Sequence, residues 1–272
     1  MSPTERALGA SRGWRPREGW RIFAGEVGII VVGVLLALGA QEVADQWRWS
    51  KDVARTKADL DSEILGNVVL SAERVAISQC LRGRIAELRD ALVATDGSWK
   101  AMPFRGLVDT NPSARVMPVV YRAPSRVWTT DVWEQAKDKG MFNHMKAEEL
   151  TRYSGVYEQL RGLRTENSDE QTLQAQLAGL GFDGAIDPTL RSQALSTLAQ
   201  LDARNHLIVL VAGQIAVVAS RLEGRLSMAQ QAELGGYIKG QRAFRGVCVD
   251  EAAARKLLAP LMPGKPVATG PQ

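Results

Sequence analysis

Two cysteines carry most of the reactive chemistry in this chain. Cys80 and Cys248 are far apart in sequence, and in an oxidising compartment such a pair can form a disulfide. A bridge between them would close a loop of about 170 residues and stabilise the fold by roughly 5 kcal/mol as an upper figure. The alternative is two buried free thiols that act as small apolar groups. We predict a Cys80–Cys248 disulfide that holds the carboxy-terminal helix against the first long helix.

The other residues that could do chemistry form no recognisable site. His144 and His206 are the only histidines, and neither sits in the His-x-x-x-His or Cys-x-x-Cys spacing that zinc sites use. His206 borders an apolar stretch, which indicates a packed core or edge residue. The acidic pairs Glu148-Glu149 and Asp169-Glu170 are interpreted as solvated helix faces. Without a nucleophile motif, a P-loop or a dinucleotide-binding motif, we expect no enzyme activity, no metal and no cofactor.

The composition is that of a folded protein. The chain has 272 residues, of which 45% are hydrophobic and 24% are charged, enough for one or two domains with a buried core. The 34 basic and 30 acidic residues leave a formal charge of only +4. No basic stripe is interleaved with aromatic residues, so nucleic acid is not an expected partner.

The clearest signal is an apolar run near the amino terminus. It extends from Ile22 to Ala40 and is interrupted only by Glu26. Its uncharged part is shorter than the roughly 20 residues of a full span. However, Trp20 and Trp47 flank the run, and about 40 Å of helix separates them at about 1.5 Å per residue. Tryptophans at both interfaces are typical of a membrane helix, so we predict one transmembrane helix over 22–43.

Two alternatives to a permanent anchor remain open. The basic start, the apolar centre and Ala37-Leu38-Gly39 would also suit a cleaved signal peptide, although the chain stays helix-like beyond Ala40. A buried soluble helix is the other alternative. A lipoprotein anchor is excluded because no cysteine follows the run directly.

Charge predicts the orientation of the span. Residues 1–21 contain five arginines, whereas the basic residues that follow the span are balanced by acids. The positive-inside rule then predicts a cytoplasmic basic tail at 1–21 and an extracytoplasmic domain at 44–258. In a bacterium this corresponds to the inner membrane, with the folded domain in the periplasm.

One face of the predicted span carries mostly small residues. Steps of three and four residues join Glu26, Ile30, Gly33, Ala37, Ala40 and Ala44. Small residues let membrane helices approach closely, and an acid on the same face can form a hydrogen bond to a partner helix. We hypothesise self-association through this face. The simpler interpretation is that Glu26 only reaches the cytoplasmic interface.

The rest of the chain predicts an all-α domain. Apolar residues recur at helical spacing from Leu60 to Leu92, so the membrane helix is expected to continue as one long helix to about Asp96-Gly97. Charged residues along this stretch, including Glu73 and Arg74, are expected to fill its other faces. The proline- and glycine-rich segment 96–125 predicts a long irregular connection, with a short strand at Val116–Tyr121 as an alternative. Coiled-coil pairing is a rival use of the apolar stripe, but its heptad is imperfect.

Further helices are marked by local stop and start signals. They are expected at 126–139 ending at Gly140, at 146–177, from Asp187-Pro188 to Gly224, at 228–243 behind a Ser227–Gln230 capping box, and from Asp250 to Leu258. Residues 259–272 read as a disordered tail. Residues 205–220 are uncharged and could form a second span, but a central helix of an antiparallel helical bundle is the preferred interpretation.

Two segments resemble a known group of proteins. The run from Gly25 to Leu38 is similar to the amino terminus of a widespread family of uncharacterised bacterial single-pass membrane proteins with an extracytoplasmic helical domain. The segment from Val132 to Gly140, which continues toward Tyr153 and Tyr157, also resembles that family. The resemblance implies architecture and location only, because the family is a domain of unknown function. Taken from the residues alone, Trp133 and the two tyrosines are expected to be core residues whose hydroxyl groups need partners.

Three functions are compatible with these features. The first is a membrane-anchored, non-enzymatic interaction or scaffold protein of the bacterial envelope, whose partner is a second copy or another envelope protein. The second is a ligand-sensing helical bundle that signals through a partner, since only a short tail precedes the span. The third is an envelope enzyme with an unrecognised site. A ligand-sized cavity would favour the second, and a cleft holding carboxylates of shifted pKa would favour the third.

Overall fold

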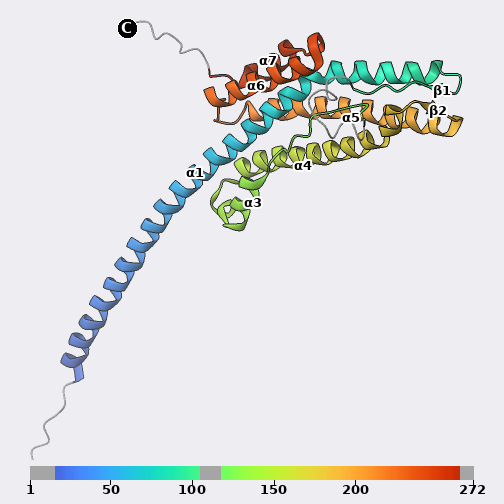
Figure 1. Cartoon of the computed structure of the whole chain (residues 1–272). Helices are drawn as coiled ribbons and strands as arrows, with labels where there is room; N and C mark the ends of the chain where they lie inside the picture. The colour runs from blue at the N-terminus through green and yellow to red at the C-terminus, as the bar shows by residue number, and fades with distance from the viewer. Residues whose placement is uncertain (1–15, 105–117, 264–272) are drawn as a thin grey trace, which may run out of the picture. The chain divides into compact units, whose positions relative to one another are not determined.

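The protein is all-α. The structure, a computed structural model, describes residues 16–104 and 118–263, with the backbone alone for residues 16–22. Six α-helices and one two-stranded ladder lie in these residues (Figure 1). The chain divides into two compact units, residues 1–52 and residues 53–272. The all-α prediction is therefore confirmed.

Helix α1 (Pro16–Ala94) contributes to both units. In the first unit its apolar side chains are exposed, from Phe23 through Leu38. Within the described residues, two helices have stretches long and apolar enough to cross a membrane. One is in α1, where no residue of the 18-residue apolar window is buried, and the other is in Pro188–Ala219, where 33% of the window is buried. The predicted span at 22–43 thus coincides with the more exposed of the two.

In the second unit the residues of α1 from Val53 onward contribute a continuous buried stripe. The stripe is made by Leu60, Ile64, Val68, Ala72, Ile77, Leu81, Leu88 and Leu92. Burial of a leucine or isoleucine side chain contributes about 1.5–3 kcal/mol, so this stripe is the centre of the unit's hydrophobic core. The helix ends at Ala94 and Gly97 has φ +112°, close to the predicted end at Asp96-Gly97.

In its described residues, 96–104 and 118–125, the predicted connection has no regular structure apart from one short ladder; residues 105–117 lie outside the described residues. Strand β1 (Ser98–Trp99) pairs antiparallel with β2 (Gly184–Ala185). The alternative of a strand at Val116–Tyr121 is not supported by its described part, because residues 118–121 form no strand; residues 116–117 lie outside the described residues.

Helices α3 (Asp131–Asp138) and α4 (Ala147–Gln176) follow, with the 3₁₀ turn η2 (Met141–His144) between them. Gly140 has φ +69°, the left-handed stop that its sequence position predicted. The predicted helix at 126–139 begins five residues too early, because Arg126–Thr130 are not helical and form hydrogen bonds with Glu73 and Asn67 of α1.

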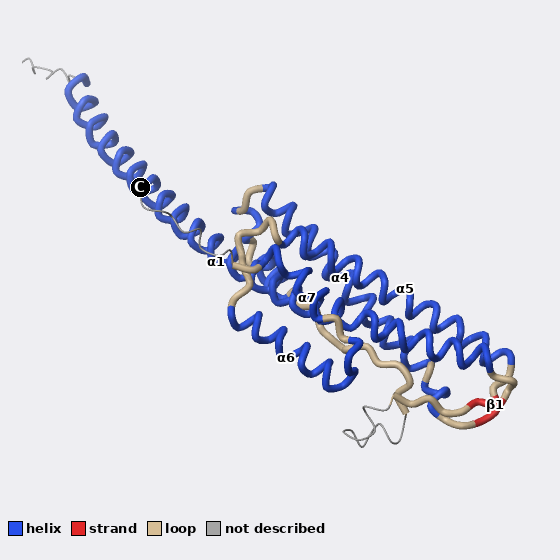
Figure 2. Tube along the Cα trace, turned by 90° about the horizontal axis from the view of Figure 1, so that it is seen from above, coloured by secondary structure: helices blue, strands red, loops and turns tan. Residues whose placement is uncertain are grey.

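The 3₁₀ turn η3 (Ala178–Gly181) and strand β2 lead from α4 into α5 (Pro188–Ala219). The Asp187 side chain accepts from the backbone N–H groups of Thr189 and Leu190 at 2.7 and 2.9 Å, as the Asp-Pro signal predicted. Helices α4 and α5 lie side by side, with the ladder at one end of the pair (Figures 1 and 2). Helix α5 ends at Ala219, whereas the sequence predicted that it would extend to Gly224.

Helices α6 (Met228–Arg245) and α7 (Glu251–Leu258) cover another face of α1, joined by the turn η4 (Gly246–Cys248). The Ser227–Gln230 capping box and the Asp250 cap are both present. The predicted disordered tail at 259–272 is wrong for its first residues, because Ala259–Leu261 forms the turn η5 and Leu261 is fully buried. Residues 264–272 lie outside the described residues.

Candidate functional site

The tyrosines of α4 donate to carboxylates of α1. The Tyr153 hydroxyl donates to Oδ1 of Asp61 at 2.7 Å, and the Tyr157 hydroxyl donates to Oε2 of Glu63 at 2.8 Å. The other oxygen of Asp61 accepts from the backbone N–H of Gly224 at 2.9 Å. Gly224 therefore does not end α5; it brings its backbone against Asp61, where a Cβ would lie 2.8 Å from the Asp61 Cβ.

Glu63 also holds the start of α3. Its Oε1 accepts from the backbone N–H groups of Asp131 and Val132 at 2.8 and 3.2 Å, which satisfies donors that a helix start leaves free. Next to this cap the ring of Trp133 stacks on Tyr157, with centroids 4.7 Å apart. We call Asp61, Glu63, Trp133, Tyr153 and Tyr157 the tyrosine clamp. It brings together the residues of the second segment that carried the family resemblance.

Both phenols of the tyrosine clamp are held in the protonated form. Burial raises the pKa of Tyr153 and Tyr157 far above 10.0, and the neighbouring carboxylates Asp61 and Glu63 raise it further. A protonated phenol beside a carboxylate is a hydrogen-bond donor and cannot act as a base near neutral pH. The clamp is therefore suited to joining α1, α3 and α4, which is the core role expected from the residues alone.

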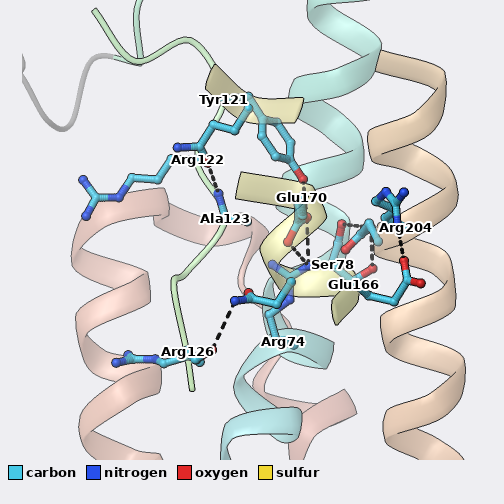
Figure 3. A network of polar contacts seen from close by, with 12 residues as sticks. Arg74, Ser78, Tyr121, Arg122, Ala123, Arg126, Glu166, Glu170 and Arg204 are labelled. Carbon is cyan, nitrogen blue, oxygen red and sulfur yellow. Dashed lines mark hydrogen bonds and ion pairs between the residues drawn. The ribbon is translucent and has the colours of Figure 1, made fainter. Parts of the chain in front are cut away.

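A fully buried ion pair lies further along α1. Nη2 of Arg74 is 3.0 Å from both carboxylate oxygens of Glu170 on α4. The Tyr121 hydroxyl donates to the same carboxylate at 3.0 Å, and Figure 3 shows both groups converging on Glu170. The Arg74 and Glu170 side chains are 0% exposed. The expectation that Asp169-Glu170 and Arg74 belong to solvated faces is therefore wrong for Glu170 and Arg74.

A second ion pair extends this network toward α6. The Arg126 guanidinium donates to both oxygens of Glu73 at 2.7 and 2.9 Å, and Gln241 on α6 donates to Glu73 at 2.9 Å. Arg126 also lies over the ring of Tyr237, 4.3 Å from its centroid. The hydrogen bond to Glu73 raises the pKa of Arg126. Because Glu73 is buried, its expected placement on a charged outer face is also wrong.

The network leaves some buried donors without partners. Within the described part of the chain, Nε and Nη1 of Arg74 have no hydrogen-bond partner. Nearby, burial lowers the pKa of Arg245 to about 10. Its Nη2 donates to the Arg122 carbonyl at 2.5 Å. Arg74 is therefore held through Nη2 alone, by Glu170, whereas Arg245 is held by both Gln241 and the Arg122 carbonyl.

The two cysteines lie at disulfide-bonding distance. The sulfurs of Cys80 and Cys248 are 2.10 Å apart, and their Cα atoms are 5.2 Å apart. Cys80 belongs to α1 and Cys248 to η4, and the backbone N–H of Asp250 donates to the Ala76 carbonyl at 2.8 Å beside them. The predicted pairing therefore joins the chain between α6 and α7 to α1.

A cleft of about 720 Å³ lies where the β1–β2 ladder meets α4 and α5. Its lining includes the buried residues Trp99, Leu180 and Ile186 and the half-exposed side chains of Phe182 and Leu190. The indole N–H of Trp99 donates to the Leu180 carbonyl at 2.9 Å. We call this the ladder cleft; apart from Trp99, its lining residues all lie between Gln176 and Gln200. The sequence analysis missed it because the cleft forms only where this stretch folds back on itself and against β1.

The remaining predicted site residues lie together on the part of α1 in the first unit. Glu26, Gly33, Ala37, Ala40 and Ala44 are exposed residues of α1 in the first unit, so their role in self-association stays a prediction. A Cβ built on Gly33 meets nothing within 4 Å.

Neither histidine belongs to a metal site in the described residues. No group of three or more histidine, cysteine, aspartate or glutamate side chains that could hold a metal ion occurs there. His206 is exposed on α5, which makes it an edge residue, and His144 lies in η2.

Three carboxylates have a pKa lowered by hydrogen-bond donors beside them. The pKa is lowered for Glu149 by its hydrogen bond from Lys57, for Asp183 by the Ala101 backbone N–H, and for Glu251 by Arg255. A general acid needs the opposite direction. These three carboxylates are therefore poor candidates for acid catalysis.

Comparisons of the chain with protein-family models, with curated proteins and with solved structures found no match. The family resemblance described above therefore stays a prediction.

Proposed function

We propose that this chain is a single-pass protein of the bacterial inner membrane with residues 1–21 in the cytoplasm. In this proposal residues 44–258 form a periplasmic, antiparallel helical bundle that acts as a non-enzymatic interaction or scaffold module. Its partners are the lipid membrane and a second copy or another envelope protein. The main support for this proposal is the 18-residue apolar stretch of α1, in which no residue is buried within the chain. Exposed apolar surface of this extent needs lipid or a partner to cover it.

Two further features support this proposal. A cysteine pair at bonding distance suits an oxidising compartment such as the periplasm. The tyrosine clamp and the Arg74–Glu170 network commit the buried polar residues of the second unit to contacts between its own segments. An interaction module needs a fixed body of this kind, whereas an enzyme needs reactive groups free to meet a substrate.

Topology can be tested in intact spheroplasts and in inverted membrane vesicles. Under the proposal, external protease removes the 44–258 body in spheroplasts and leaves it protected in inverted vesicles. Alkylation before reduction should find no free thiol in the native chain. A body that survives in intact spheroplasts, or two free thiols, would contradict the proposed location.

The interaction role needs a separate experiment. Crosslinking in native membranes should yield products with the full chain that are absent when only residues 1–52 are expressed. Loss of the body without any change in the crosslinked products would remove the case for a periplasmic interaction module.

Self-association through the membrane helix has its own matched pair of variants. Gly33→Leu should reduce the crosslinked dimer by filling the small-residue face, whereas Val34→Leu, one position away on a different face, should not. Equal dimer in both variants and in the wild type would exclude this face.

A ligand-sensing module is the second candidate, and the observation in its favour is the ladder cleft. A volume of about 720 Å³ is within the range of small-molecule sites.

A further inference from the structure

The ladder cleft has a polar lining with almost no charge. Helix α5 contributes Gln193, Ser196, Thr197 and Gln200, whose spacing of three, four and seven residues places them on one helix face. Gln176 of α4 joins them, and its Oε1 accepts from the Thr197 hydroxyl at 3.2 Å. Amides and hydroxyls both donate and accept hydrogen bonds, so this wall suits a ligand whose groups do the same.

Charge is limited to the rim of the cleft. Asp183 is the single ionisable residue among those that line it. Its Oδ1 accepts from the Ala101 N–H at 2.7 Å and its Oδ2 lies 3.7 Å from Lys100. The Asp183 side chain is 64% exposed, so it is the single charge that a ligand would meet, and it lies at the solvent-facing edge of the cleft. In a chain with 24% charged residues this composition is unusual.

Apolar groups also line the cleft, with Leu190 on α5 three residues before Gln193 and Phe182 in the segment that leads into β2. Phe182 and Leu190 are each 51% exposed, although residues of this size are usually buried. An exposed aromatic ring next to amide and hydroxyl side chains combines a flat apolar surface with hydrogen-bonding groups. The ring faces of a sugar are apolar and its edges carry hydroxyls, so a saccharide matches both halves of the lining.

We propose that the ladder cleft binds a neutral oligosaccharide, with its hydroxyl and amide groups on Gln193, Ser196 and Gln200 and one sugar ring on Phe182. This inference deepens the proposed function, on whose non-enzymatic binding role it rests, by naming the class of ligand. It does not depend on the orientation of the span.

The test uses the purified full chain in a detergent without a sugar headgroup. Calorimetry measures the binding of three separate tetrasaccharides to this chain. One is built of N-acetylglucosamine, one of α-linked glucose and one of β-linked glucose. At least one should bind saturably, and Gln193→Ala and Phe182→Ala should each weaken that binding about tenfold, roughly the effect of one lost contact. Met228→Ala, which truncates an even more exposed apolar residue outside the cleft, should leave binding unchanged.

Three outcomes would overturn the inference. The first is no saturable binding up to about 10 mM, where a Kd of about 1 mM would be evident. The second is tighter binding of an anionic oligosaccharide or of a neutral peptide than of every neutral sugar. The third is binding that Met228→Ala weakens as much as Phe182→Ala does. Because binding is measured in solution, a failure here leaves the topology and crosslinking results unaffected.

Discussion

Arg74 and Glu170 illustrate how much one residue can matter in this fold. Both side chains are 0% exposed and each is the other's charge partner. Removing one partner of a buried pair leaves the other charge without compensation, at a cost of about 3–5 kcal/mol. We expect Glu170→Ala to lower the free energy of unfolding by that amount in urea titrations of the detergent-solubilised chain. Glu158→Ala, at an exposed position of the same helix, should change it by less than about 0.5 kcal/mol.

The Tyr121 hydroxyl gives a milder test of the same network. Tyr121→Phe removes one hydrogen bond to Glu170 and keeps the ring, so we expect a loss of about 1–2 kcal/mol. A cost as large as that of Glu170→Ala would indicate that the hydroxyl, rather than Arg74, provides the main compensation for the Glu170 charge. The measurement is the same urea titration.

The tyrosine clamp makes stability depend on alkaline pH. The folded-state pKa of Tyr153 and Tyr157 is raised above the ordinary value of 10.0, so the folded chain retains protons that the unfolded chain releases. The stabilisation is therefore complete below about pH 10 and is lost as pH rises beyond it. The free energy of unfolding should fall above pH 10, and the phenolate absorbance of these residues should appear only with unfolding.

A Tyr153→Phe, Tyr157→Phe double variant is the control for this pH dependence. It lacks both ionisable hydroxyls, so its stability should decline less steeply above pH 10 than that of the wild type. Phenolate absorbance from all four tyrosines at pH 10–11, in a chain that is still folded, would show that the clamp does not protect its phenols.

At the scale of elements, local signals were predictable and distant pairings were not. The caps at Asp187, Ser227 and Asp250 depend on residues within three positions of the helix start, so sequence alone identified them. Glu170 and Arg74 are 96 positions apart, and their pairing depends on how α1 and α4 pack. Glu170 does follow Leu160 and Leu163 at helical spacing, a signal that it faces the core.

A polar stripe on α1 was missed for a related reason. Asn67, Ser71, Arg74 and Ser78 step by four, three and four residues, which places them on one face. Asn67 exchanges two hydrogen bonds with the backbone of Thr129 at 2.8 and 2.9 Å, and Ser71 accepts from the Trp128 indole at 3.0 Å. Charged and polar residues on a helix usually face water, but here Asn67 and Ser71 bind the connection before α3, whose backbone groups need partners. Arg74 and Ser78 instead bind Glu170 on α4 and Asn205 on α5. The contact with the connection also explains why α3 begins at Asp131.

The cysteine pair fixes one element to another. It closes a loop with a sequence separation of 168, for which chain entropy gives up to about 5 kcal/mol. We expect a reductant to lower the urea midpoint of the wild-type chain. The Cys80→Ser, Cys248→Ser double variant should have that lower midpoint with or without reductant. A wild-type midpoint that does not respond to reductant would mean that the bridge contributes little to stability.

At the scale of the whole molecule, α5 decides whether the chain crosses the membrane once or twice. Ile208, Ala212, Ile215 and Ala219 are buried in the second unit, whereas Leu207, Leu210 and Val217 remain exposed on the same helix. The buried face packs with α4 and η5, which favours a core helix over a second span.

Removing the first unit tests this assignment directly. Residues 53–272 form a compact unit, and we expect them, when exported behind a cleavable leader, to be released by osmotic shock as a folded protein with no free thiol. The full chain should stay in the membrane through an alkaline carbonate wash. If the 53–272 fragment also resists that wash, α5 is a second span and the single-pass proposal fails. If carbonate releases a fragment that osmotic shock does not, the exposed face of α5 holds the body at the membrane surface, and Leu210→Ser should then return it to the soluble fraction.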